Sequence, residues 1–161
     1  MFEKLDAINC FRTMPITNPD HLITRTVILN AKPDEVWDAL TNPEKIKYYF
    51  FNYTATSEWE KGSPIRWTGK RKGVDVMEKG SIISLDRNVQ FKFSLFDTSS
   101  NLDDTPDNYL YVTFDILKKY DKTELSLTIE NFNEDSRRCA HIAKGWDNTV
   151  LPGLRKMFNL Y

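Results

Sequence analysis

The chain has 161 residues, of which 40% are hydrophobic and 28% charged, a balance typical of a folded domain and not of a disordered chain. Its formal net charge of −1 offers no basic surface to nucleic acid or to an anionic membrane, so we expect neither partner. The first residues lack the pattern of a signal peptide, and no apolar run is long enough to cross a membrane. We therefore expect a cytoplasmic protein.

The chain begins with a segment that does not predict regular structure. Pro15 and Pro19 interrupt residues 1–20, which we expect to form an N-terminal extension. Residues 21–29 alternate and are rich in β-branched side chains, which predicts the first strand of a domain at residues 21–161.

Two short helices are predicted after this strand. Residues 32–40 form the first, because Pro33 suits the opening turn and acidic residues follow it where the helix dipole favours negative charge. Residues 41–50 form the second, with Thr41 or Asn42 as its cap and Pro43 at its first position.

The middle of the chain predicts a series of antiparallel strands joined by short turns. Gly80 within one of them predicts a bulge or a bend. Residues 69–73 are expected to be a basic, solvated hairpin tip, and residues 97–108 a polar loop. The predicted strands are residues 53–59, 63–68, 74–85, 89–96, 109–117 and 123–132.

Alternation along these strands predicts a sheet with one apolar face, which needs a cover. The last element, residues 135–160, carries apolar residues at helical spacing and can supply that cover. Pro152 and Gly153 lie inside it, so we expect a kink near residues 148–149. The whole order predicts an α+β fold in which a curved antiparallel sheet wraps around a long C-terminal helix.

Two segments carry a resemblance to a known family. Residues 26–43, with Ala-Lys-Pro-Asp-Glu-Val-Trp-Asp-Ala-Leu-Thr at 31–41, resemble the strand-to-helix opening of START-like (SRPBCC) proteins. Residues 145–154, Gly-Trp-Asp-Asn-Thr-Val-Leu-Pro-Gly-Leu, resemble the last helix of one branch, which is similar to the C-terminal domain of the activator of the heat-shock protein 90 ATPase. The resemblance covers residues 22–158.

The resemblance implies a helix-grip fold with an internal cavity, which many relatives use for hydrophobic ligands such as lipids, hormones and polyketides. It does not imply a reaction, because a fold alone does not fix a function.

Aromatic side chains are the best candidates for contact with such a ligand. If the predicted faces are right, five rings converge between the sheet and the last helix, together with Val150. The other interpretation is a packed core without a cavity. The five rings are those of Trp67, Phe91, Phe93, Phe114 and Trp146.

Two polar residues are candidate contacts for a ligand's polar end. Arg66 lies on a middle strand, as Glu78 does, and a charge facing the cavity would need a partner because an unpaired buried charge is costly. An outer-face position in solvent is the alternative for Arg66. His141 lies one residue off the apolar stripe of the last helix, where a surface or core-edge position is the alternative to an acid–base role.

Motifs that would indicate catalysis or metal binding are missing from the sequence. It contains no Gly-x-Ser-x-Gly, no HExxH and no Gly-rich phosphate loop, and Cys10 and Cys139 belong to no metal-binding spacing. We expect no catalytic residue, metal or cofactor, and two free thiols, with a disulfide between them left open.

Three functions remain after this reading. The first is a module that binds a small apolar molecule. The second is a co-chaperone-like module of the stress response that stimulates a heat-shock protein 90 ATPase through its surface, and the third is an enzyme of the polyketide cyclase type. The first is favoured, and the sequence leaves a monomer and a homodimer equally open.

Overall fold

The protein is described by a computed structural model that covers residues 21–133 and 135–159. The predicted N-terminal extension and Cys10 lie outside the described residues. Seven antiparallel strands form one sheet in the order β1-β7-β6-β5-β4-β3-β2. The strands are β1 (Leu22–Leu29), β2 (Thr54–Ser57), β3 (Pro64–Arg71), β4 (Val74–Asp86), β5 (Gln90–Asp97), β6 (Leu110–Lys119) and β7 (Lys122–Asn131).

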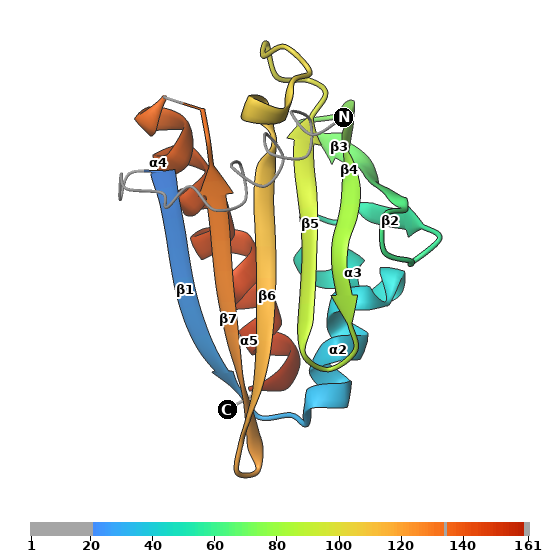
Figure 1. Ribbon diagram of the computed structural model, residues 1–161, viewed down its shortest axis with the longest axis vertical. Helices are drawn as coiled ribbons and strands as arrows, with labels where there is room; N and C mark the ends of the chain where they lie inside the picture. The colour runs from blue at the N-terminus through green and yellow to red at the C-terminus, as the bar shows by residue number, and fades with distance from the viewer. Residues whose placement is uncertain (1–20, 134, 160–161) are drawn as a thin grey trace, which may run out of the picture.

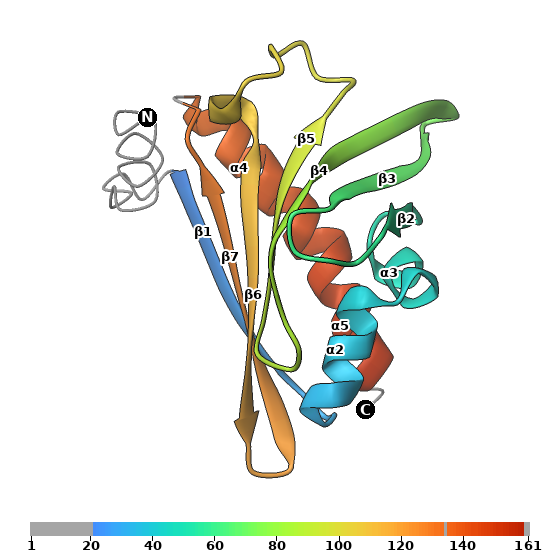
Figure 2. The ribbon, with the colours of Figure 1, turned by 45° about the vertical axis from the view of Figure 1, so that its right-hand side comes forward.

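The helices gather on one side of this curved sheet (Figures 1 and 2). The C-terminal helix runs diagonally across the concave face, and the two short helices cover its lower end on the β4 side. The helical segments are α2 (Pro33–Thr41), α3 (Pro43–Tyr49), a 3-10 turn η2 (Pro106–Asn108), α4 (Ser136–Gly145), the π-helical η3 (Trp146–Val150) and α5 (Leu151–Phe158). The predicted α+β helix-grip architecture is therefore confirmed.

The two short helices begin as the sequence predicts. Pro33 opens α2, where Glu35 accepts a hydrogen bond from the backbone N–H of Lys32 (2.7 Å). Asn42 caps α3 by accepting from the backbone N–H of Glu44 (3.1 Å).

The predicted apolar face of the sheet is buried against the helices. Side chains at alternate positions of β3, β5, β6 and β7 point inward, as the period of two requires. Among them are Ile65 and Trp67, Phe91 and Phe93, Val112 and Phe114, and Leu125 and Leu127, each at most 3% exposed. Trp37 of α2 meets Phe91 edge to face at 6.4 Å, which docks that helix on the sheet.

The long helix departs from α geometry where a kink is predicted. Residues Trp146–Val150 form a π-helical turn, and α5 then begins with Pro152 in its first turn, where its missing N–H costs no hydrogen bond. Arg25 of β1 donates from Nε and Nη2 to the two carboxylate oxygens of Asp147 (2.9 Å each), which ties this turn to the edge strand.

Three local expectations differ from the structure. The register shift in β4 falls between Ile82 and Ser84, whereas Gly80 lies where a Cβ would be 1.7 Å from the carbonyl oxygen of Ser94. Gly80 thus permits a close approach of β5 instead of forming the bulge. Val89 is 52% exposed because it belongs to the turn before β5 and not to the buried face. The predicted strand at residues 53–59 shortens to β2, Thr54–Ser57.

Candidate functional site

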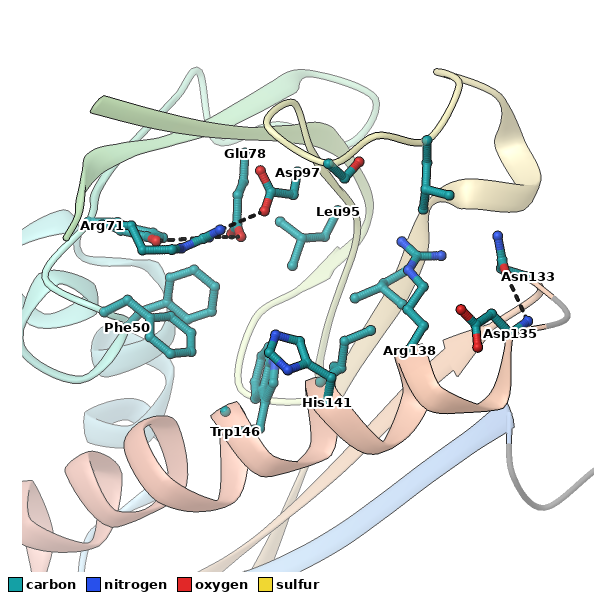
Figure 3. Close-up of a pocket in the computed structure, with 17 residues that line it drawn as sticks. Phe50, Arg71, Glu78, Leu95, Asp97, Asn133, Asp135, Arg138, His141 and Trp146 are labelled. Carbon is teal, nitrogen blue, oxygen red and sulfur yellow. Dashed lines mark hydrogen bonds and ion pairs between the residues drawn. The ribbon is translucent and has the colours of Figure 1, made fainter. Parts of the chain in front are cut away.

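A pocket of about 540 Å³ lies between α4 and the part of the sheet that contains the end of β3, Glu78 of β4 and the end of β5 (Figure 3). This volume falls within the roughly 300–1,000 Å³ typical of small-molecule sites. The segment after α3 and the loop between β5 and β6 complete its walls. The pocket thus lies between the sheet and the last helix.

One part of the pocket wall is apolar and aromatic. Phe50 packs edge to face against Trp146 (5.6 Å between ring centroids) and against Phe51 (5.2 Å). This surface can take up a hydrophobic body, because burying apolar area on it stabilises a complex by about 25 cal/mol per Å². The other apolar side chains that line the pocket are Leu95, Leu102, Leu110 and Ile142.

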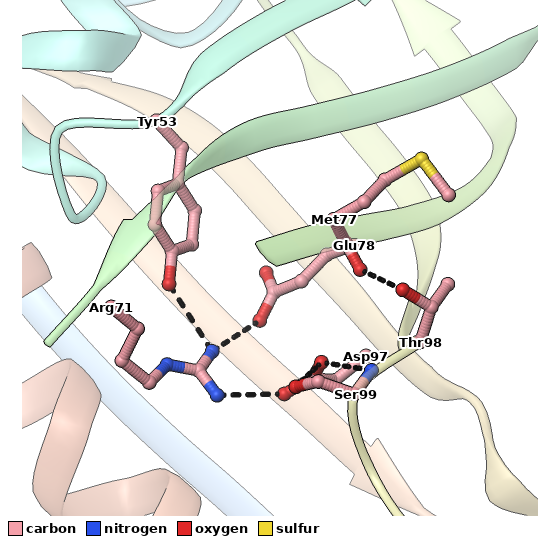
Figure 4. A network of polar contacts seen from close by, with 7 residues as sticks. All are labelled: Tyr53, Arg71, Met77, Glu78, Asp97, Thr98 and Ser99. Atoms are coloured by element: carbon pink, nitrogen blue, oxygen red, sulfur yellow. Dashed lines mark hydrogen bonds and ion pairs between the residues drawn. The ribbon is translucent and has the colours of Figure 1, made fainter. Parts of the chain in front are cut away.

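The facing wall carries a polar network centred on Arg71 (Figure 4). The Arg71 guanidinium donates to Asp97 Oδ2 (3.0 Å) and to the hydroxyl of Tyr53 (3.1 Å), and it lies 3.5 Å from Glu78 Oε1. Asp97 also accepts from the backbone N–H (2.9 Å) and the hydroxyl (2.6 Å) of Ser99. One guanidinium therefore interacts with two carboxylates, and its contact with Asp97 is the shorter of the two.

In this network the pKa values of the two acids shift in opposite directions. The pKa of Glu78 is raised to about 7, first by burial and then by the nearby charge of Asp97, and the attraction of Arg71 only partly offsets these two effects. Burial also opposes the charge of Asp97, but its hydrogen bonds with Ser99 and Arg71 outweigh burial and lower its pKa. Asp97 is thus a carboxylate at neutral pH, while Glu78 is divided between its neutral and charged forms.

The position of Tyr53 in this network depends on a glycine in β3. A Cβ on Gly69 would lie 2.4 Å from the Tyr53 ring, so only glycine lets the ring rest on the strand. The ring is 97% buried and its hydroxyl reaches Arg71 two residues further along β3. Residues Lys72 and Gly73 then make the tight turn to β4, and both have positive φ as such turns require.

A second arginine enters the pocket from the first turn of α4. Arg138 donates to the side-chain oxygen of Asn131 (3.0 Å) and to the backbone carbonyl of Asn108 (2.6 Å), and its side chain rises toward the pocket (Figure 3). Burial lowers its pKa, although an arginine remains protonated in proteins.

The predicted site residues divide between this pocket and the core behind it. Trp146 and His141 line the pocket. The other four rings surround a void of only about 10 Å³, with Phe93 5.0 Å from both Trp67 and Phe91 between ring centroids. Phe114 and the fully buried Val150 belong to the same packed core. Arg66 is exposed on the outer face of β3, as its alternative interpretation had it.

Sequence reasoning missed Arg71, Asp97 and Arg138. The sequence predicts a solvated hairpin tip at residues 69–73, but β3 runs to Arg71 and the turn consists of the next two residues alone. The sequence predicts a polar loop from Asp97 onward, but Asp97 is the last residue of β5. The available signal is that a basic and an acidic residue, Arg71 and Asp97, closely follow the predicted strands at residues 63–68 and 89–96.

Within the described ranges, no group of three or more His, Cys, Asp and Glu side chains is arranged to hold a metal ion. Among the helices of the same ranges, none is long and apolar enough to cross a membrane. Cys139 is buried in the core on α4.

Comparisons with known proteins agree with this architecture. A family model described as Activator of Hsp90 ATPase homolog 1-like protein matches residues 30–159. A protein from Cytophaga hutchinsonii, known from its solution structure, is 33% identical, with a TM-score of 0.73 over 89% of this chain and 95% of that one. The comparison with curated protein sequences gave no match.

Two more distant structures share the fold. One is an HSP90 activator from Plasmodium falciparum, 15% identical with a TM-score of 0.67 over 85% of this chain and 95% of the other. The second is the Aha1 dimer from Colwellia psychrerythraea, 18% identical with the same TM-score and the same two coverages.

Proposed function

The chain belongs to the family of Activator of Hsp90 ATPase homolog 1-like proteins, and from this premise we propose that it binds a small, largely apolar molecule in the pocket beside α4. The observation that carries the proposal is the pocket itself, a space of about 540 Å³ with an aromatic and aliphatic wall facing a few polar groups. Concave sites of this size and lining are typical of small-molecule binding.

The packed aromatic core supports this assignment by contrast. Its void of about 10 Å³ holds at most a water molecule, so the core serves stability while the pocket is left for a ligand. Trp146 contributes to both, with one side in the core and another on the pocket, and can therefore report binding through its fluorescence.

A second candidate function is contact with a chaperone of the heat-shock protein 90 type. It is favoured by the family and by the shared fold of the Plasmodium falciparum HSP90 activator. This function would use the surface of the domain and would not need the pocket to be filled. A homodimer is a further proposal, motivated by the dimeric Colwellia psychrerythraea relative.

Native mass spectrometry of the freshly purified protein tests the first proposal. We expect an added mass that is present in the native spectrum and lost on denaturation. The Ile142→Trp variant, which places an indole in the pocket wall, should lose that mass. Ala140→Trp is the matched control, because Ala140 lies on the same helix but is exposed, and it should retain it.

An empty protein would not by itself decide the matter, so a thermal-shift screen with fatty acids, sterols and aromatic polyketides accompanies the spectra. If none of these compounds raises the melting temperature and no mass is bound, the pocket is not a ligand site. Pull-down with a heat-shock protein 90 chaperone would then test the second candidate function.

A further inference from the structure

The polar groups of the pocket differ in how completely their charges are balanced. Arg71 is neutralised by Asp97 at 3.0 Å and has Glu78 in addition at 3.5 Å. The wall formed by β3, β4 and β5 therefore has no surplus of positive charge. A negatively charged ligand group placed there would meet Asp97, which stays ionised.

Arg138, on the opposite wall, is in a different position. Both of its hydrogen-bond acceptors, the side chain of Asn131 and the backbone of Asn108, are neutral. Across residues 21–133 and 135–159, no carboxylate forms an ion pair with its guanidinium, and the charges of Asp135 and Asp97 act on it only through space. Its charge is thus held in place by two oxygens and neutralised by neither. Three of its five N–H groups remain for another partner.

The acids nearest to Arg138 are already engaged elsewhere. Asp135 caps α4, and its carboxylate accepts hydrogen bonds from the backbone N–H (3.0 Å) and the side chain (3.2 Å) of Arg137. Asp97 is held by Arg71 and Ser99. Arg138 also lies in the first turn of α4, where the helix dipole adds positive potential.

A hydroxyl group without a hydrogen-bond partner lines the same pocket. The hydroxyl oxygen of Ser100 is buried and makes no hydrogen bond within the part of the chain that the structure describes. A buried hydroxyl without a partner costs free energy, which a ligand with an oxygen-bearing head group can recover. Leu102, Leu110 and Ile142 give this part of the wall its apolar surface, next to the polar side chains of Asn133 and Asp135.

We propose that the ligand of this pocket is an organic acid with an apolar body, whose carboxylate binds Arg138 while its body lies on the aliphatic and aromatic wall. The inference rests on the proposed function, since it names the chemical class that the pocket takes. A charged hydrogen bond between guanidinium and carboxylate sets the orientation of the ligand, and the apolar wall provides most of its affinity. Glu78 and Asp97 lie on the opposite wall from this head group and disfavour the reverse orientation (Figure 3).

Three probes of equal chain length test the inference by isothermal titration at pH 7.4: decanoic acid, 1-decanol and decylamine. We expect decanoic acid to bind most tightly. In Arg138→Gln, which removes the charge but keeps an amide donor, its affinity should fall at least about tenfold while that of 1-decanol stays unchanged. Arg155→Gln is the matched control, because it removes the same charge from an exposed position on α5 that does not line the pocket.

The outcomes separate the inference from the function on which it rests. Tighter binding of decylamine than of decanoic acid by the unaltered protein overturns the inference, and this comparison needs no folded variant. Equal binding of the acid and the alcohol, or an equal loss of affinity in the two glutamine variants, overturns it as well while leaving a ligand site intact. If none of the three probes binds, the inference falls, and the native mass spectra and the thermal-shift screen decide whether the proposed function falls with it.

Discussion

The Glu78 carboxyl makes the stability of this fold depend on pH in a way that a single substitution should remove. Its pKa is raised from 4.5 in a model compound to about 7, chiefly by burial and by the charge of Asp97. A raised carboxyl pKa means that the folded state holds the proton more tightly than the unfolded state. The stability it contributes is therefore complete below pH 4.5 and is lost as the pH rises through 7.

The size of the effect follows from these two values. Each pH unit between them costs about 1.4 kcal/mol, so the free energy of unfolding should fall by about 3 kcal/mol at most. The side chain is only 13% exposed, so solvent screens the effect little. In Glu78→Gln the residue is neutral at every pH, and we expect this decline to disappear.

Urea unfolding followed by circular dichroism at intervals from pH 4.5 to 8 measures the difference. Glu78→Gln should match the unaltered protein at the acid end and exceed its stability at pH 8. Glu60→Gln, which removes a carboxylate from an exposed turn, is the control and should follow the unaltered protein throughout. Parallel curves for Glu78→Gln and the unaltered protein would refute the assigned environment of Glu78.

Other substitutions test the packing around the site. Gly69→Ala should lower the free energy of unfolding by about 1–3 kcal/mol, because its Cβ would lie 2.4 Å from the Tyr53 ring. Gly145→Ala is the control in thermal melts and should be neutral or slightly stabilising, because its nearest contact would be at 3.6 Å. Phe93→Leu should cost about 1–2 kcal/mol in urea unfolding yet leave decanoic acid binding unchanged, and a large loss of affinity would instead place Phe93 in the site. Thr123→Val should lower the free energy of unfolding by about 1–3 kcal/mol, because the fully buried Thr123 hydroxyl donates to a backbone carbonyl at 2.7 Å. A change below about 0.5 kcal/mol, which is the usual range for surface substitutions, would contradict this role.

The fold was largely predictable because its sequence signals are periodic and local. Alternation along β5, β6 and β7 identified the buried faces, and the prolines marked the starts of α2 and α3. The break in the last helix was expected from Pro152 and Gly153, and it takes the form of a π-helical turn. In each of these cases neighbouring residues contain the information.

The site was less predictable because its residues meet only through tertiary structure. Inward-facing aromatic positions identify a buried region, but periodicity does not say which part of that region is filled and which is empty. Phe93 and Trp146 carry the same signal, yet one is enclosed by other rings and the other borders the pocket. The side chain of Arg138 is held at the pocket by hydrogen bonds to Asn108 and Asn131, which lie 30 and 7 residues away along the chain.

Methyl NMR of the protein during titration with decanoic acid tests most directly the claim that the pocket beside α4 is a ligand site. We predict that the methyl signals of Leu95, Leu102, Leu110 and Ile142 shift, because these side chains line the pocket. The signals of Leu40 and Leu29, which are buried elsewhere in the core, should stay in place. The absence of shifts at the four pocket residues, or shifts that are largest at Leu40 beside the aromatic core, would contradict the account.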